Sequence, residues 1–125
     1  MMLSVGNDLI EIARVKRSIQ NPRFIARVFG VREIEELKEK SAQSYAAAFA
    51  AKESFAKALG TGIRGFSMCE VELLHDEFGA PYLFLSGRAR QLAEKRRMSF
   101  AVSVTHTDTL AGAVVIGTKT EETSR

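Results

Sequence analysis

Residues 44–60 read SYAAAFAAKESFAKALG, and this stretch decides the fold. Alanine dominates it, which favours an α-helix over residues 44–59, and Gly60 is a typical helix terminator. Small side chains allow neighbouring elements to approach such a helix closely. We therefore predict a long, mostly buried central helix on which the rest of the chain packs.

The flanking sequence supplies the elements around this helix. Residues 70–74 and 82–85 alternate polar and apolar side chains, as strands do. Apolar residues from Leu9 to Ile19 recur at helical spacing, with Asp8 in the place of an N-cap. The predicted order is strand 3–5, helices 8–20, 24–29, 31–40 and 44–59, strands 70–74 and 82–85, helix 87–97, and strands 100–104 and 110–116. This order predicts an α+β fold, an antiparallel sheet packed against the long central helix.

No repeat, low-complexity stretch or linker divides the chain. We therefore predict a single domain over residues 1–118, followed by a polar tail at residues 119–125. Within the helix predicted over residues 31–40, the spacing places Glu36 to pair with Lys40.

Composition narrows the class of protein. The 125 residues carry 18 basic and 15 acidic side chains, a net charge of +3, and a single cysteine, Cys69. The start of the sequence lacks the features of a signal peptide, and no apolar run is long enough to cross a bilayer. We expect a cytoplasmic protein with no membrane association and no disulfide. The mild positive charge suits a phosphorylated or weakly anionic partner rather than nucleic acid.

Three groups of residues could carry chemistry. Asp8 follows Gly6 and Asn7 at the predicted end of a strand, where its ordinary role would be a helix N-cap. Glu53 and Lys57 stand four residues apart in the alanine-rich helix and share one face. They could form an ordinary surface ion pair, but charge in an apolar helix is costly unless a ligand or metal compensates it.

The third group is formed by glycines and by the end of a strand. Gly60 and Gly62 follow the helix, and such glycines can act as a helix stop and a turn or let phosphate approach the backbone closely. Ser103 to His106 end a predicted strand with two hydroxyls and a histidine. Oxygen ligands without sulfur suit a hard cation such as Mg²⁺, which usually completes its coordination with water and phosphate. Together the groups favour phosphoryl transfer, in which positioning and charge stabilisation dominate.

The motifs GNDLIEIAR (residues 6–14), FAAKESFAKALGTG (residues 49–62) and SVTH (residues 103–106) occur in this order. With GAPY at residues 79–82, they closely resemble the holo-[acyl-carrier-protein] synthase family of small 4′-phosphopantetheinyl transferases. The resemblance runs from Val5 to about Ile116, and its central block is the most specific part. It implies the 4′-phosphopantetheinyl transferase fold. It also implies transfer of phosphopantetheine from coenzyme A to a serine of apo acyl carrier protein, with release of 3′,5′-ADP, in fatty acid biosynthesis.

The resemblance also implies roles for individual residues. Asp8 and Glu53 would hold Mg²⁺, and Glu53, Lys57 and His106 would be the catalytic residues. The coenzyme A site would comprise Lys57, Gly60, Thr61, Gly62, Pro81, Ser103, Thr105 and His106. The carrier-protein face would comprise Arg14, Arg23, Phe24 and Arg27, a basic surface that suits an acidic partner.

Other implications stay open at this stage. The base that takes the serine proton could be Glu53, a water on the metal, or a carboxylate such as Glu33 or Glu35. The family forms homotrimers with active sites between subunits, so we expect a homotrimer here. Position 48 is often arginine in the family and is Ala48 in this chain, and Arg64 is a possible substitute for the missing charge.

Two other classes of protein compete with this interpretation. A metal-dependent phosphodiesterase or nuclease could use the same carboxylates, but such sites usually gather more carboxylates and histidines. A non-catalytic nucleic-acid-binding module would explain the basic early region. The chain has no tryptophan and only two tyrosines, however, and lacks the interleaved aromatic and basic residues that stack bases.

Overall fold

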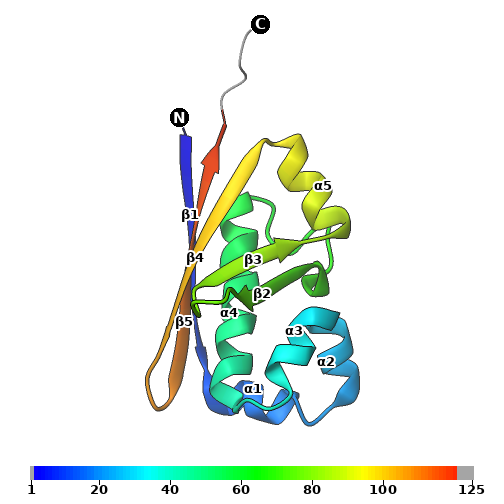
Figure 1. Ribbon diagram of the computed structural model, residues 1–125, viewed down its shortest axis with the longest axis vertical. Coiled ribbons are helices and arrows are strands. Elements are labelled where there is room, and N and C mark those ends of the chain that lie inside the picture. Colours follow the sequence, from blue (N-terminus) through cyan, green and yellow to red (C-terminus); the bar gives the residue numbers. More distant parts are fainter. Residues whose placement is uncertain (1, 121–125) are drawn as a thin grey trace, which may run out of the picture.

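A long helix, α4 (Ala42–Leu59), lies at the centre of the computed structural model, which describes residues 2–120. Its alanines are almost completely buried: Ala46, Ala50 and Ala51 are 0% exposed. Gly60 ends the helix in a left-handed conformation, with φ of 92°. The predicted central helix is confirmed, and it lies between a three-stranded sheet on one side and a β-hairpin and shorter helices on the other (Figure 1).

A three-stranded antiparallel sheet covers one side of α4. Its order is β1 (Met2–Glu11), β5 (Leu110–Lys119) and β4 (Met98–His106). Gly6 permits close contact between β1 and α4, because a Cβ at this position would lie 2.0 Å from the Ser54 carbonyl oxygen. Hydrogen bonds also join the two layers, since Ser54 Oγ donates to the Ala113 carbonyl at 3.0 Å.

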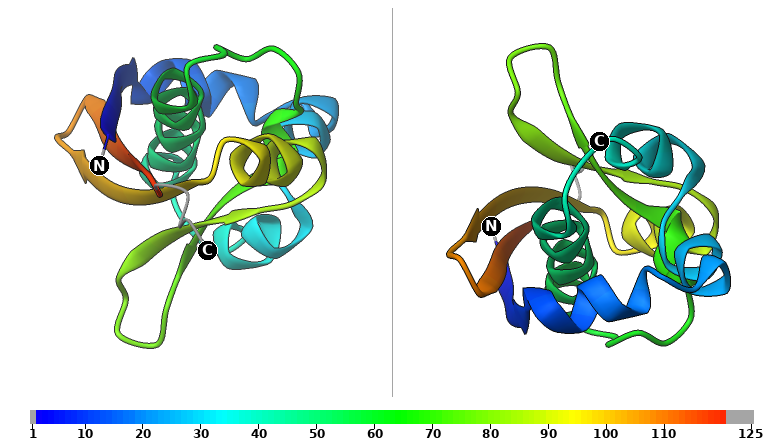
Figure 2. Two further views of the ribbon diagram at one scale, coloured as in Figure 1. Left: turned by 90° about the horizontal axis from the view of Figure 1, so that it is seen from above. Right: turned by 90° about the horizontal axis from the view of Figure 1, so that it is seen from below.

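A hairpin and a fifth helix lie on the other side of α4. Strands β2 (Val71–His75) and β3 (Pro81–Leu85) pair antiparallel, and a short 3₁₀ helix, η1 (Met68–Glu70), precedes them. Helix α5 (Gly87–Lys95) follows β3 and leads into β4. Figure 2 shows that the tip of the hairpin projects beyond the helices and the sheet. The predicted α+β fold is therefore confirmed.

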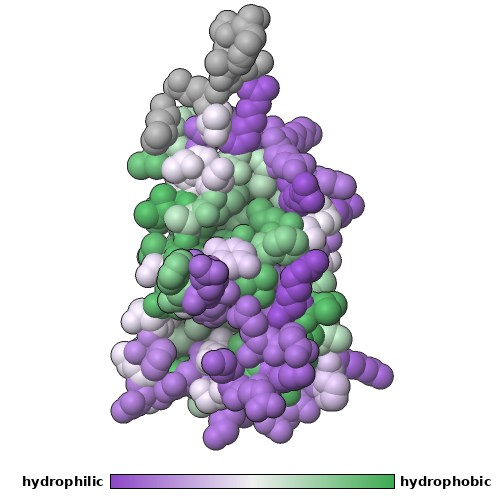
Figure 3. All heavy atoms as spheres, viewed as in Figure 1, coloured by the Kyte–Doolittle hydropathy of each residue, from purple (hydrophilic) through white to green (hydrophobic). Residues whose placement is uncertain are grey.

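Three short helices close one end of the molecule. They are α1 (Ile12–Ser18), α2 (Pro22–Val28) and α3 (Val31–Leu37), and they lie beside the N-terminal half of α4 (Figure 1). Asn21 caps α2, because its side chain accepts a hydrogen bond from the Arg23 N–H at 2.9 Å. Hydrophilic side chains dominate this end of the surface in Figure 3.

The predicted start of the first helix was wrong. Asp8 is not an N-cap, since β1 continues through it to Glu11, and the helix begins only at Ile12. Every residue of β1 faces a partner in β5, Asp8 opposite Ala113. This pairing outweighs the local helical spacing. The predicted ion pair of Glu36 with Lys40 is also replaced, because Glu36 contacts His75 instead.

The predicted tail begins within the last strand. Lys119 belongs to β5, and the Thr120 N–H donates to the Arg97 carbonyl. Residues 121–125 of that predicted tail lie outside the described residues. Within residues 2–120, no helix is both long and apolar enough to cross a membrane.

Candidate active site

Asp8 and Lys57 meet where β1 packs against α4. The Lys57 Nζ lies 3.7 Å from Asp8 Oδ1 and donates a hydrogen bond to the Asn7 carbonyl at 2.8 Å. The Lys57 side chain is 53% exposed and that of Asp8 is 22% exposed, so both remain accessible to a ligand. The glycine at position 6 makes this arrangement possible by letting the strand and helix backbones approach.

Glu53 joins this pair from the preceding turn of α4. Burial raises the pKa of Glu53, the negative charge of Asp8 raises it further, and Lys57 opposes both effects. The two carboxylates therefore lie close enough to repel each other, which is the arrangement that a bound cation relieves. The predicted combination of Asp8, Glu53 and Lys57 is brought together, although the first of them comes from a strand 45 residues away (53 − 8).

The donor set fits Mg²⁺. Among residues 2–120 no cluster of three histidine, cysteine, aspartate or glutamate side chains could hold a metal. Two carboxylates leave most coordination positions to water and to a ligand, as Mg²⁺ prefers in sites that bind phosphorylated substrates.

A glycine loop extends from the end of α4, directly after Lys57. Gly60, Gly62 and Gly65 all have positive φ angles, of 92°, 66° and 88°. A Cβ at Gly62 would meet no atom within 4 Å, so the loop has open space beside it, and the Thr61 hydroxyl bonds only locally, to the Gly62 carbonyl. Successive glycines of this kind leave backbone N–H groups free to bind phosphate.

The sheet register carries the predicted strand-end residues towards Asp8. Asp8 and Val104 both stand opposite Ala113, one on each side of β5. Ser103 and Thr105 flank Val104 and border a groove with residues 7–9. Because side chains alternate along a strand, the exposed Ser103 and Thr105 side chains point to the outer face of the sheet, whereas those of Val104 and Asp8 point towards α4. The register therefore brings the backbone of these residues near Asp8 but leaves the Ser103 and Thr105 side chains on the face of the sheet opposite its carboxylate. Their role in ligand binding stays a prediction.

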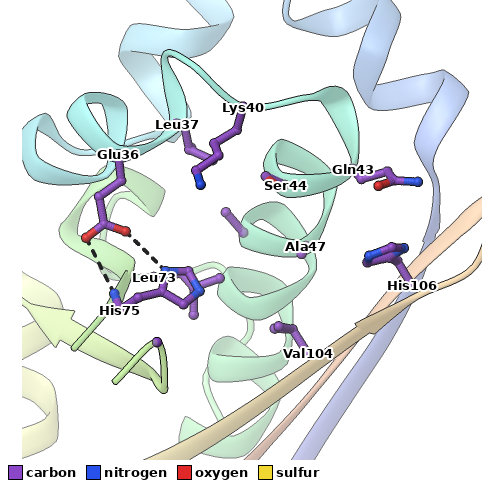
Figure 4. Close-up of a pocket in the computed structure, with 12 residues that line it drawn as sticks. Glu36, Leu37, Lys40, Gln43, Ser44, Ala47, Leu73, His75, Val104 and His106 are labelled. Atoms are coloured by element: carbon purple, nitrogen blue, oxygen red, sulfur yellow. Dashed lines mark hydrogen bonds and ion pairs between the residues drawn. The ribbon is translucent and has the colours of Figure 1, made fainter. Parts of the chain in front are cut away.

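His106 faces a different space. It lines a cavity of about 530 Å³ between α3, α4, the β2–β3 hairpin and β4. Figure 4 shows Glu36, Lys40 and His75 on one side of this cavity and Gln43 and His106 on the other. His75 Nδ1 lies 3.1 Å from Glu36 Oε1. Within one chain, His106 is thus separated from the groove that contains Asp8.

Sequence reasoning did not single out the residues of this cavity as a group. They come from elements far apart in the chain, and nothing in their local sequence marks them. Pro81 stands opposite His75 in the hairpin, near the cavity. Ala48 lines the cavity wall and is 1% exposed. Arg64 lies in the loop after α4, which ends at Leu59, about 17 Å along the helix axis from Ala48. Its role as a substitute for the missing charge stays a prediction.

The residues predicted for the carrier-protein face lie on two successive helices, α1 and α2. Arg14, Arg23 and Arg27 are exposed on these two helices. Phe24 is half-buried, and its ring stacks on that of Phe49 with 6.1 Å between centroids. Arg14 and both rings line a small pocket of about 70 Å³. The structure therefore combines basic side chains with an apolar depression on one surface.

Glu33 was wrong as a candidate base, because it is completely buried. Its carboxylate accepts hydrogen bonds from Lys52 Nζ, from the Leu73 N–H at 2.8 Å and from the Gly30 N–H at 3.1 Å. Burial raises the pKa of Glu33 and lowers that of Lys52, and each charge compensates the other. Glu35, the other candidate on α3, is 72% exposed and pairs with Lys38.

Comparisons with known proteins identify the family to which the chain belongs. Residues 4–114 match the family model of the 4′-phosphopantetheinyl transferase superfamily. A holo-[acyl-carrier-protein] synthase of a Thermoanaerobacter species is 42% identical over 123 residues, covering 94% of this chain and 89% of the relative. The holo-[acyl-carrier-protein] synthase of Treponema denticola is 40% identical, covering 93% of this chain and 98% of the relative.

Solved structures show the same fold. The holo-[acyl-carrier-protein] synthase of Neisseria meningitidis has a TM-score of 0.86 at 30% identity, covering 93% of this chain and 98% of that one. The Helicobacter pylori enzyme, solved in complex with coenzyme A, has a TM-score of 0.81 at 29% identity, covering 91% of this chain and 99% of that one. The chain belongs to the holo-[acyl-carrier-protein] synthase family of the 4′-phosphopantetheinyl transferase superfamily.

Proposed function

We propose that this protein transfers the 4′-phosphopantetheine group of coenzyme A to a serine of apo acyl carrier protein, in a Mg²⁺-dependent reaction of fatty acid biosynthesis. The observation that carries the proposal is the cluster of Asp8, Glu53 and Lys57 beside the glycine loop. It combines a cation site with a phosphate site, and family membership identifies the substrates that fit it.

The reaction breaks a phosphoanhydride bond and forms a phosphoester bond. The serine hydroxyl oxygen of the carrier forms a bond to the β-phosphorus of coenzyme A. The bond from that phosphorus to the bridging pyrophosphate oxygen breaks, and 3′,5′-ADP leaves. Asp8 and Glu53 would hold Mg²⁺, which supplies positive charge to the pyrophosphate oxygens. The Lys57 ammonium and the backbone N–H groups of residues 60–62 would bind the phosphate oxygens and compensate the negative charge that Mg²⁺ leaves.

We propose that Glu53 is the base that takes the proton from the serine hydroxyl of the carrier protein. Of the carboxylates considered from the sequence, Glu33 is inaccessible and Glu35 lies on the outer surface of α3. Glu53 is the remaining carboxylate of the three, and it lies on α4 in the same cluster as Asp8 and Lys57.

We further propose that the carrier protein docks on the face formed by Arg14, Arg23, Phe24 and Arg27. Arg14 lines the pocket beside Phe24, and Arg23 and Arg27 are exposed on α2, the helix that carries Phe24. An acidic partner would be steered by the charges and anchored by apolar contact at the pocket.

The outer face of the three-stranded sheet supports a homotrimer. It exposes large apolar side chains, among them Leu3, Val5 and Leu9, which are 68%, 65% and 67% exposed. Figure 3 shows hydrophobic side chains along the left edge of the molecule, where this sheet lies in Figure 1. We propose that this face associates with other copies of the chain in the cytoplasm and that the groove with Asp8 becomes an active site between subunits.

Intact-mass spectrometry tests the reaction directly. Apo acyl carrier protein incubated with coenzyme A, Mg²⁺ and this protein should gain the mass of one phosphopantetheine, and EDTA should abolish the gain. An unchanged carrier mass at micromolar enzyme would contradict the proposal.

Sedimentation at micromolar concentration tests the assembly. A trimer should dissociate on dilution with loss of specific activity. A species of 13.8 kDa that keeps full activity would show that one chain suffices.

A further inference from the structure

The glycine loop is attached to α5 at both of its ends. At the start, Arg96 Nη1 donates a hydrogen bond to the carbonyl of Leu59, the last residue of α4. At the far end, Arg88 Nε donates to the Gly65 carbonyl at 3.0 Å. Figure 1 shows α5 at the same end of the molecule as the C-terminal end of α4. Two arginines thus bracket the six residues that separate α4 from Phe66 (65 − 60 + 1).

Helix α5 is itself fixed firmly enough to serve as a support. The Glu70 carboxylate accepts hydrogen bonds from the Ala89 N–H at 3.2 Å and from the Ser67 N–H at 3.1 Å. Leu92 packs against the cluster that contains Phe55 and Phe66. The helix therefore shares buried contacts with α4 and shares Glu70 with the segment that follows the loop.

The loop needs such a support. Its glycines have the largest conformational freedom of any residue type, so its backbone N–H groups would lose much entropy on binding phosphate. Holding both ends in advance reduces this cost, which improves affinity without adding a contact to the ligand. Arg96 also satisfies the carbonyl of Leu59, one of the last four carbonyls of α4, which have no partner within the helix.

We propose that Arg88 and Arg96 are positioning residues for the phosphate-binding loop, and that they set the affinity for coenzyme A without contacting it. This inference rests on the proposed function, because it takes the loop as the pyrophosphate site. It concerns coenzyme A alone, since the carrier-protein face lies at the opposite end of α4.

Steady-state titration of each substrate tests the inference. Arg96→Ala and Arg88→Ala should each raise the KM for coenzyme A about fivefold to tenfold, the loss expected for one hydrogen bond from a charged donor. The KM for apo acyl carrier protein should change by less than about twofold. Calorimetric titration with coenzyme A and Mg²⁺ should show the same loss of affinity. Arg90→Ala is the matched control, because Arg90 lies on the same helix, is 66% exposed and pairs with Glu94.

The remaining outcomes are decisive. Equal increases in both KM values, or unchanged coenzyme A affinity in variants with normal melting temperature, would overturn the inference. An effect that disappears in 0.5 M salt would overturn it too, because it would indicate direct attraction of phosphate by charge. If Arg96→Ala fails to fold, the exposed Arg88 provides the test. The wild-type protein in the same assay separates this inference from the proposed function. If the wild type transferred no phosphopantetheine, the proposed function would be contradicted, whereas the positioning role would still be judged by the calorimetric affinities.

Discussion

Two lysines of α4 stand five residues apart and occupy opposite environments. Lys52 is 0% exposed and donates to Glu33 and to the Val71 carbonyl. Lys57 is 53% exposed and lies beside Asp8, with Glu53 one turn away. The first lysine is part of the core, joining α4 to α3 and β2, and the second lies in the candidate active site.

The difference shows what a charge in an apolar helix means. The sequence argument was that such a charge needs compensation by a ligand or a metal. At Lys52 the protein itself provides the compensation, through a carboxylate that accepts three hydrogen bonds. At Glu53 burial and the charge of Asp8 raise the pKa and Lys57 offsets them only in part, so a bound cation would supply the remaining compensation. The sign and number of the neighbours therefore distinguish structural from functional charges.

The largest expected effect is a loss of stability when the buried pair of Lys52 and Glu33 is broken. Lys52→Met should destabilise the protein by about 3–5 kcal/mol, because it leaves the Glu33 carboxylate buried without a counter-charge. Lys57→Met, the same change at the exposed lysine, should alter the free energy of unfolding by less than about 1 kcal/mol. Urea denaturation of the two variants measures both values. Equal destabilisation would mean that the two lysines do not differ as described.

The next effect is on activity and leaves stability intact. Asp8→Ala and Glu53→Ala should each lower the transfer rate by about 100-fold or more, since even residues that only orient metal ligands contribute 10-fold to 100-fold. Both melting temperatures should stay near that of the wild type. Near-normal turnover in both variants would refute the assignment of these carboxylates as the cation site.

A smaller effect concerns the pH dependence of stability without metal. The folded state raises the pKa of Glu53, so the contribution of this group is present below its unfolded pKa and is lost as pH rises through the folded pKa. In EDTA, Glu53→Gln should therefore match the wild type at acid pH and melt about 2 °C higher at pH 7. Mg²⁺ should reverse the order at pH 7 by stabilising the wild type alone. Thermal scans at both pH values, with and without metal, measure this.

The smallest effect lies at the other end of α4. Arg14→Glu should raise the KM for the carrier protein about threefold to tenfold through a slower association that depends on salt, with the KM for coenzyme A unchanged. Arg17→Glu, on the same helix but outside the described pocket, is the control. An equal change in both KM values would argue against a separate carrier-protein face.

The sequence predicted the parts of this molecule that depend on local signals. The central helix was predicted over residues 44–59 and runs from Ala42 to Leu59, because alanine content and Gly60 act locally. Asp8 was misread as a helix cap because its conformation depends on pairing with Ala113. The burial of Glu33 could not be predicted either, because it depends on pairing with Lys52, which lies on another helix. The cavity beside His106 gathers separate elements that no local pattern connects.

The pairing of β1 with β5 has a consequence for how the molecule is made. β5 is the only neighbour of β1 in the sheet, and the pair begins with Met2 opposite Lys119, which are 117 positions apart (119 − 2). Contacts this distant in sequence form late in folding, because a long loop must close before they add stability. During translation β5 leaves the ribosome after every other described element. A nascent chain therefore cannot hold Asp8 against Glu53, and the site forms only once β5 has been synthesised.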